Sequence, residues 1–363
     1  MTRQSKKRLA GLRQRLDRRG LDALLVNDEM NVRYLSGFTG DSSAVIVGRS
    51  DAVFITDSRY TEQAAAECPG FDIVTRRSRM IGEIVEQAVA LGIESLGVEA
   101  HVLTLDSGGR LRDELAPIKM VETTRLIEGL RERKSKQEVD TIRACIEASE
   151  RCIAHVRNYL VPGIRERDIA AEMEYFVRGL GFDGMAFPPI VAFGPRGSLP
   201  HARVTDRRMA EGDAVLIDWG VAGGGYCSDL TRVFFHHKIP DRFKRIYQIV
   251  LEAQKRAIDR IGPGVSAQEV DAAARDYIAR SGFGEQFGHG LGHGIGMEVH
   301  EAPTIGPSSE GQLRRRMVFT VEPGIYLPGV GGVRIEDDVL VTSRGVKVLS
   351  DAPKRLNDMI ISA

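Results

Sequence analysis

Cysteine is scarce in this sequence, and long apolar runs are missing. The chain of 363 residues has four cysteines and no Cys-x-x-Cys pair, which argues against a disulfide-stapled scaffold. No run approaches eighteen apolar residues, so no membrane span is predicted. The first twenty residues are polar and basic without an apolar stretch, unlike a secretory signal. We therefore expect a cytoplasmic protein whose thiols are small buried groups.

An excess of charge of either sign is also missing. Lys and Arg number 50, and so do Asp and Glu. A net charge of zero argues against nucleic acid or a membrane surface as the main partner. The sequence is 42% apolar and 28% charged, which is typical of a soluble globular protein.

Two regions with different patterns predict two domains. Residues 1–130 alternate short apolar runs such as DALLVND, SSAVIVG, AVFITDS and SLGVEA with amphipathic stretches, as expected for an α/β domain. A charged stretch, residues 130–138, then leads into a long helical pattern. We interpret it as the linker to a second domain, residues 131–363.

The second region repeats one pattern twice. Helices are predicted at 136–160, 166–180, 241–261 and 266–280. Each pair precedes a predicted β-hairpin of two strands, residues 214–235 around three glycines and residues 317–342 around a Pro/Gly-rich turn. This order suggests an internal pseudo-repeat.

Carboxylates interrupt the apolar strands of both hairpins. Asp218 and Asp229 lie in the first hairpin, and Glu322 and Glu336 lie in the second. A carboxylate in a buried strand is costly unless it is paired or bound to metal. Any one of them alone could be a surface acid, but the matched positions favour a joint role. Arginines cannot neutralise all four, whereas two divalent cations would.

Three histidines cluster in the glycine-rich run FGHGLGHGIGMEVHEAP, residues 287–303. His289 and His293 have the i, i+4 spacing of a zinc-protease helix, but Gly290 stands where that motif requires Glu. Five glycines in residues 288–296 also disfavour a helix. An extended segment that approaches a ligand closely is the better interpretation. Another histidine, His201, follows Pro200 in the loop FGPRGSLPHARVTD.

The ordered motifs SLPH, IDWG, YCSDLTR, GHGLGHGIGMEVHEAP, TVEPGIY and GVRIEDD resemble the metallopeptidases of the pita-bread fold, most closely the proline-specific Xaa-Pro aminopeptidases and prolidases. Residues 1–130 resemble the N-terminal domain that this branch shares with creatinase. The resemblance implies an α/β (α+β) protein, with a creatinase-like α/β domain followed by a pita-bread catalytic domain. It also implies hydrolysis of the peptide bond before proline in short peptides.

The resemblance assigns a role to each matched residue. The implied metal ligands are Asp218, Asp229, His293, Glu322 and Glu336, with Asp229 and Glu336 bridging two ions. Glu322 would also act as acid and base. His201 and His300 would contact the substrate or intermediate, with support from His289 and Arg334. Mn²⁺ or Co²⁺ is expected, Zn²⁺ is the further option, and a homodimer is expected.

Other interpretations stay open at this point. A methionine-aminopeptidase-like enzyme leaves the N-terminal domain unexplained, and an inactive binding protein or a creatinase-like enzyme leaves the complete ligand set unexplained. Dipeptidase and aminopeptidase action are not separated. Phe187, Pro188 and Pro189 are candidates for an apolar proline pocket. Asp337 and Asp338 are expected outside the ligand set, as supporting or surface residues.

Overall fold

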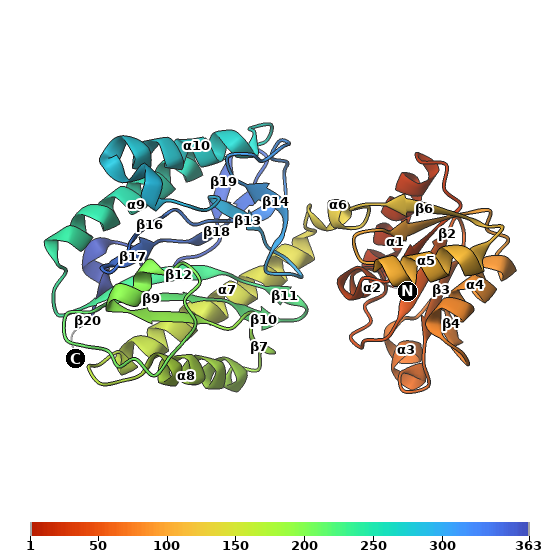
Figure 1. Cartoon of the computed structure of the whole chain (residues 1–363), viewed down its shortest axis with the longest axis horizontal. Coiled ribbons are helices and arrows are strands. Elements are labelled where there is room, and N and C mark those ends of the chain that lie inside the picture. Colours follow the sequence, from red (N-terminus) through yellow and green to blue (C-terminus); the bar gives the residue numbers. More distant parts are fainter. Residues whose placement is uncertain (1, 362–363) are drawn as a thin grey trace. The chain divides into compact units, whose positions relative to one another are not determined.

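The computed structural model describes residues 2–361 and divides into two compact units, Met1–Arg131 and Glu132–Ala363 (Figure 1). Each unit has its own buried apolar cluster. Within residues 2–361, no helix combines the length and the apolar character needed to cross a membrane.

The first unit is built on a six-stranded sheet with the order β4-β3-β2-β1-β5-β6. Its core joins strand residues such as Leu25 and Ile46 to Ile84 of α4 and Leu111 of α5. The inner strands β1, β2 and β3 are thus apolar because they are buried beneath covering helices. The elements are α1 (Arg3–Asp17), β1 (Ala23–Val26), α2 (Glu29–Ser36), β2 (Ala44–Gly48), β3 (Ala52–Thr56), α3 (Thr61–Glu67), β4 (Asp72–Thr75), α4 (Met80–Ala90), β5 (Ser95–Glu99), α5 (Leu105–Leu115), β6 (Lys119–Thr123) and α6 (Glu128–Arg131).

The second unit has two halves of similar order. A pair of long helices precedes each group of strands, as the sequence pattern predicted. The first half contains α7 (Lys136–Val156), η1 (Arg157–Tyr159), α8 (Glu166–Gly179), β7 (Gly184–Met185), β8 (Ile190–Phe193), η2 (Gly194–Ser198), β9 (Ala214–Trp219), β10 (Val221–Gly223), β11 (Tyr226–Cys227) and β12 (Leu230–His236). A capping box of Ser135 and Glu138 begins α7, so the predicted charged linker contains a helix start.

The second half repeats this order with α9 and α10. Its elements are α9 (Asp241–Arg260), α10 (Ala267–Ile278), η3 (Ala279–Phe283), η4 (Gly284–Gln286), β13 (Gly292–Gly294), β14 (Glu301–Ile305), β15 (Val318–Val321), β16 (Gly324–Leu327), β17 (Gly331–Arg334), β18 (Asp337–Val341), β19 (Val346–Val348), η5 (Leu356–Met359) and β20 (Ile360–Ile361). The two main sheets of the unit run β20-β12-β9-β8 and β14-β13-β15-β18-β19. Figure 1 shows α7 and α8 on one side of the strands and α9 and α10 on the other.

Both predicted hairpins exist, but each is split into an inner and an outer ladder. In the first, β9 pairs with β12 and β10 with β11. Its inner turn is Gly224-Gly225, with φ of 58° and 78°, the left-handed values of a two-residue hairpin turn. In the second, β15 pairs with β18 and β16 with β17. The expected pair of continuous strands is therefore corrected to four short strands, and the carboxylates lie at or beside the breaks.

Candidate active site

A cavity of about 350 Å³ lies in the second unit and is lined by residues of both halves. All nine residues singled out from the sequence line it: His201, Asp218, Asp229, His289, His293, His300, Glu322, Arg334 and Glu336. Part of the wall is apolar, from Phe187, Ile190, Pro200 and Val299. Of the three expected pocket residues, Phe187 lines the cavity, whereas Pro188 and Pro189 are not among its lining residues in the described chain.

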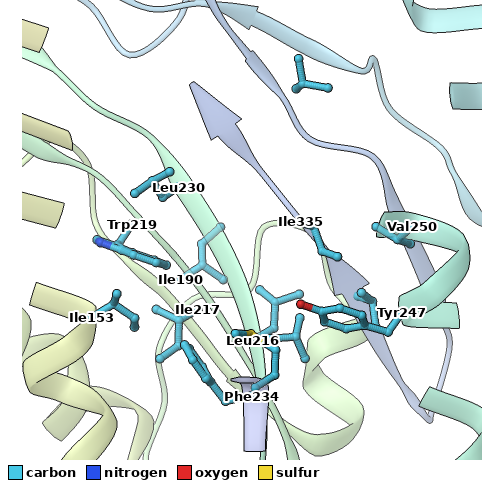
Figure 2. Close-up of a cluster of buried hydrophobic side chains, with 14 of the residues drawn as sticks. Ile153, Ile190, Leu216, Ile217, Trp219, Leu230, Phe234, Tyr247, Val250 and Ile335 are labelled. Carbon is cyan, nitrogen blue, oxygen red and sulfur yellow. The ribbon is translucent and has the colours of Figure 1, made fainter. Parts of the chain in front are cut away.

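Strand alternation directs Asp218 toward the cavity. Ile217 and Trp219 share the opposite face of β9, where Figure 2 shows them on the side of Ile153 of α7. The Trp219 Nε1 donates to the backbone oxygen of Ser149 at 3.0 Å, which anchors this face to α7. Because successive side chains alternate, Asp218 faces the other half of the unit.

Asp229 is a diagonal neighbour of Asp218 and does not lie directly opposite it. The Cα partner of Asp218 is Thr231, and Asp229 precedes β12 at the break of the ladder. The two acids are thus offset by two residues along the ladder. Diagonal positions on one face remain within reach of each other. The register also puts Thr231 on the same face as both acids.

Glu322 and Glu336 meet across the break in the second hairpin. Val321 pairs with Asp337 and Gly324 pairs with Arg334, so the register is the same on both sides of the break. Glu322 therefore lies opposite Glu336. The Glu322 N–H donates to the Leu291 oxygen at 2.8 Å and the Glu336 N–H donates to the Thr231 oxygen at 3.3 Å. At this break, the backbone N–H groups of the two glutamates thus bond to residues outside the hairpin, beside β13 and on β12.

His293 stands on β13, an extended strand, which confirms that the glycine-rich run is not a zinc-protease helix. Its Nδ1 lies 3.2 Å from the Gly294 oxygen, so Nδ1 carries the hydrogen and Nε2 keeps a free lone pair. That Nε2 lies 3.4 Å from Glu322 Oε1 and 3.7 Å from Asp229 Oδ2. Burial is the largest cause that lowers the pKa of His293 to about 4. The ring is therefore a neutral donor of electrons.

The acids of this cluster are buried without enough positive charge. Burial raises the pKa of Glu322 to about 8, and burial with the facing carboxylates raises the pKa of Asp229 and of Glu336 well above the usual range. Among the described residues, Asp218 Oδ1, Asp229 Oδ1 and Glu336 Oε1 have no hydrogen-bond donor. Ligand atoms of Asp229, His293 and Glu336 all lie within 4.8 Å of one another. Buried oxygens of this kind, grouped around one imidazole, fit divalent cations.

Arg334 is the buried cation that contacts the cluster. Its guanidinium donates to Asp218 Oδ2 at 2.5 Å and to Thr231 Oγ1 at 3.0 Å. The Thr231 hydroxyl in turn donates to Glu336 Oε2 at 2.5 Å. Thr231 was missed in the sequence, although its place two residues after Asp229 puts it on the same strand face. Arg334 therefore orients one acid directly and another through a threonine.

Tyr326 is a second residue that the sequence motifs contained without marking it. Its hydroxyl accepts from Arg334 Nη1 at 2.7 Å and lies 2.9 Å from His289 Nε2. The His289 Nδ1 lies 2.7 Å from the Gly290 oxygen, so Nδ1–H donates there and Nε2 accepts from Tyr326. Burial is the main cause that lowers the pKa of His289 to about 4, and Arg334 adds to it. His289 is a neutral link that supports Arg334.

The other two histidines lie toward the open side of the cavity. The His300 ring is 4.0 Å from the His293 ring, centroid to centroid. Burial lowers the pKa of His300, with His201 adding in the same direction. His201 is exposed at the rim. Both rings can therefore approach a bound molecule and donate hydrogen bonds to it.

The two acids that follow Glu336 are buried, so of the two expected positions they take the supporting one and not the surface one. Asp337 accepts from Arg232 Nη2 at 2.8 Å and from the Ser350 hydroxyl at 2.8 Å, and Lys354 also contacts it. Asp338 Oδ2 accepts the backbone N–H of Asp229 at 3.2 Å. Arg232 thus pairs with Asp337 beneath the cluster and does not neutralise the cluster acids.

A unit of two similar halves, with buried carboxylates and an imidazole converging from both, defines a metal-dependent hydrolase. The chain belongs to metallopeptidase family M24, whose model matches residues 140–343, and the creatinase/prolidase N-terminal domain matches residues 8–133. The resemblance to the pita-bread metallopeptidases and the expected fold class are therefore confirmed, and the chain is a peptidase.

Solved structures and a curated relative agree with this assignment along nearly the whole chain. An Xaa-Pro dipeptidase from Bacillus anthracis is 39% identical with a TM-score of 0.95, covering 98% of this chain and 99% of that one. An X-Pro aminopeptidase from Thermotoga maritima is 36% identical with a TM-score of 0.88, covering 96% and 100%. An Xaa-Pro dipeptidase from Pyrococcus horikoshii is 36% identical over 343 residues, covering 94% and 96%.

Proposed function

We propose that this peptidase hydrolyses the bond before proline in short peptides, with two divalent cations held by Asp218, Asp229, His293, Glu322 and Glu336. The observation that carries the proposal is the set of buried carboxylate oxygens without a hydrogen-bond donor among the described residues, grouped around the free Nε2 of His293. The names of the similar proteins support the proline specificity. A cavity of about 350 Å³ suits a short peptide.

Divalent cations, when bound, supply a water of lowered pKa and polarise the scissile carbonyl. Glu322 is proposed to accept the proton of the attacking water and to return it to the proline nitrogen as the C–N bond breaks. Glu322 suits this transfer by its position, because it lines the cavity with Oε1 3.4 Å from His293 Nε2. The leaving nitrogen of proline is a tertiary amide before cleavage, so it must gain a proton to depart.

The remaining cavity residues are proposed to bind and orient the substrate. His201 and His300 donate to the carbonyl oxygen as negative charge develops. Phe187, Ile190 and Val299 give the proline ring an apolar wall. Asp229 and Glu336 are proposed to bridge the two ions, while His289 and Arg334 hold the acids in place.

The carboxylate-rich ligand set favours Mn²⁺ or Co²⁺, with Zn²⁺ as the third candidate. A homodimer and a cytoplasmic location remain predictions, and the mass in solution from light scattering tests the first. We also propose that residues 1–130 and 131–363 are separate domains, a division supported by the two compact units.

A comparison of peptide substrates tests the function. Purified protein with added Mn²⁺ or Co²⁺ is assayed on Xaa-Pro dipeptides, Xaa-Pro-Yaa tripeptides and Met-Ala peptides. Cleavage of the proline substrates alone supports the proposal. A preference for dipeptides identifies a dipeptidase, and a preference for tripeptides identifies an aminopeptidase. Cleavage of Met-Ala without cleavage of either proline substrate contradicts the proposal.

A further inference from the structure

The carboxylate of Glu166, at the start of α8, is fully buried and belongs to no part of the mechanism above. It accepts four kinds of hydrogen bond, and all of its donors belong to residues 193–205. These are the Phe193 N–H at 3.1 Å, the Arg196 guanidinium at 2.9 Å, and the Thr205 N–H at 2.9 Å and hydroxyl at 2.6 Å. One side chain thus gathers a whole loop.

The position of these donors along the loop is informative. Phe193 ends β8 and begins the loop, whereas Thr205 lies at its other end. Arg196 lies between them in η2, and its Nη2 also donates to the Arg203 oxygen at 2.5 Å. Charge-assisted bonds of this kind are stronger than neutral ones. The buried carboxylate therefore closes residues 193–205 into a clasped loop.

The clasped loop carries Pro200 and His201 to the cavity. Within residues 2–361, the exposed His201 side chain makes no hydrogen bond of its own, so its position depends on its backbone. On the inner side, Arg334 Nη1 donates to the Pro200 oxygen at 3.3 Å. The loop also lies so close to β17 that a Cβ added at Gly332 would stand 2.3 Å from the Gly197 oxygen. The loop is therefore held both from α8 and from the site.

We propose that Glu166 is a positioning residue that fixes the loop so that His201 faces the substrate. It acts through the loop and touches neither the acids nor the cavity. The inference rests on the proposed function, because it assumes that His201 contributes to the reaction. Whether the Glu166 carboxylate holds both ends of the loop together can be tested without any substrate.

Limited proteolysis tests the clasp directly, since Arg196 and Arg203 are trypsin sites inside the loop. In Glu166→Gln the charge that holds Arg196 is gone, and we expect cleavage at these two sites to rise by about tenfold as the loop opens more often. The matched control is Glu172→Gln on the same helix, whose carboxylate pairs with His155. Thr205→Val, which replaces only the hydroxyl with a methyl group, should give a smaller increase. This variant keeps the test valid if Glu166→Gln does not fold. Unchanged cleavage relative to the control would overturn the proposal.

A double-mutant cycle tests the route through His201. On an Xaa-Pro peptide we expect Glu166→Gln to lower kcat/KM by about tenfold in the wild type, but by less than about twofold in His201→Ala. A role in general stability alone would give the same loss in both backgrounds and would overturn the proposal. Wild-type activity in His201→Ala would remove His201 from the proposed function, and the trypsin rates would still decide on the clasp.

Discussion

The His293 Nε2 lies 3.7 Å from the Asp229 Oδ2, although the two residues belong to different halves of the second unit. Asp229 precedes β12 of the first half, and His293 stands on β13 of the second. The ligand cluster therefore exists only when the two halves have packed together. A cation shared by these groups would stabilise that packing as well as serve the chemistry.

Replacement of Asp229 is the most direct test of the shared site. We expect Asp229→Ala to lower kcat/KM by more than about 100-fold. Mutation of a residue that only supports a metal ligand already lowers metal affinity or activity by roughly 10- to 100-fold, and loss of a ligand should lower it further. Bound metal per chain, measured by elemental analysis, should fall as well. The control is Asp241→Ala, whose side chain is 95% exposed. Full metal content with wild-type activity in Asp229→Ala would rule out a bridging role.

Removal of metal should affect stability together with activity. Without a cation, the buried acids face one another around Arg334, which contacts Asp218 directly and Glu336 through Thr231. Excess chelator should therefore abolish hydrolysis and lower the midpoint of thermal unfolding. Mn²⁺ or Co²⁺ at about 100 times its Kd should restore both, with roughly 3 kcal/mol of stabilisation. Activity that persists after metal analysis shows none would contradict a metal-dependent reaction.

The acids of the site were predictable from sequence because each interrupts an otherwise apolar strand pattern. Asp218 in IDWG and Glu322 in TVEPG carry this signal even without structure. Their pairing was less predictable. The Gly224-Gly225 turn sets one register for both ladders of the first hairpin, and in that register Asp218 faces Thr231 rather than Asp229. Diagonal and direct pairs cannot be told apart until the register is known.

The supporting residues were less predictable than the ligands for a different reason. Thr231 and Tyr326 are ordinary strand residues, and their importance comes from contacts with Arg334 across the two hairpins. Asp337 and Asp338 follow Glu336 directly, and nothing in the local pattern separates a buried acid from an exposed one. Arg232 and Lys354 near Asp337 decide this, and they come from distant parts of the chain.

His289 should make the second unit sensitive to acid. Its folded pKa of about 4 is lower than the usual value of about 6.5. As the pH falls between these values, the unfolded chain takes up a proton that the folded chain does not, so the unfolded state is favoured. The loss is complete below pH about 4. In His289→Gln this contribution disappears. Between pH 7 and 4 the free energy of unfolding of the variant should therefore fall by roughly 3 kcal/mol less than that of the wild type.

The measurement uses urea unfolding of metal-free protein at several pH values. Trp219, the single tryptophan, is buried in the second unit and reports on that unit. His101→Gln is the control for loss of an imidazole outside the second unit, because His101 lies in the first unit and Trp219 reports on the second. A His289→Gln curve parallel to that of the wild type would show that His289 is protonated in the folded chain.

Lys134 and Glu301 form a buried ion pair next to His300, with Lys134 Nζ 2.6 Å from Glu301 Oε1 and side-chain exposures of 1% and 6%. Removing one partner of such a pair leaves a buried charge without compensation. We expect Lys134→Met to lower the free energy of unfolding by about 3–5 kcal/mol, reported by Trp219 fluorescence. Lys136→Met, at a lysine that is 89% exposed and pairs with Asp140, should cost less than about 1 kcal/mol. Adding Glu301→Gln to Lys134→Met should recover part of the lost stability, because it removes the buried charge that Lys134→Met leaves unpaired. Equal small losses in the two lysine variants would mean that water reaches Glu301 and that the loop carrying His300 is held by other contacts.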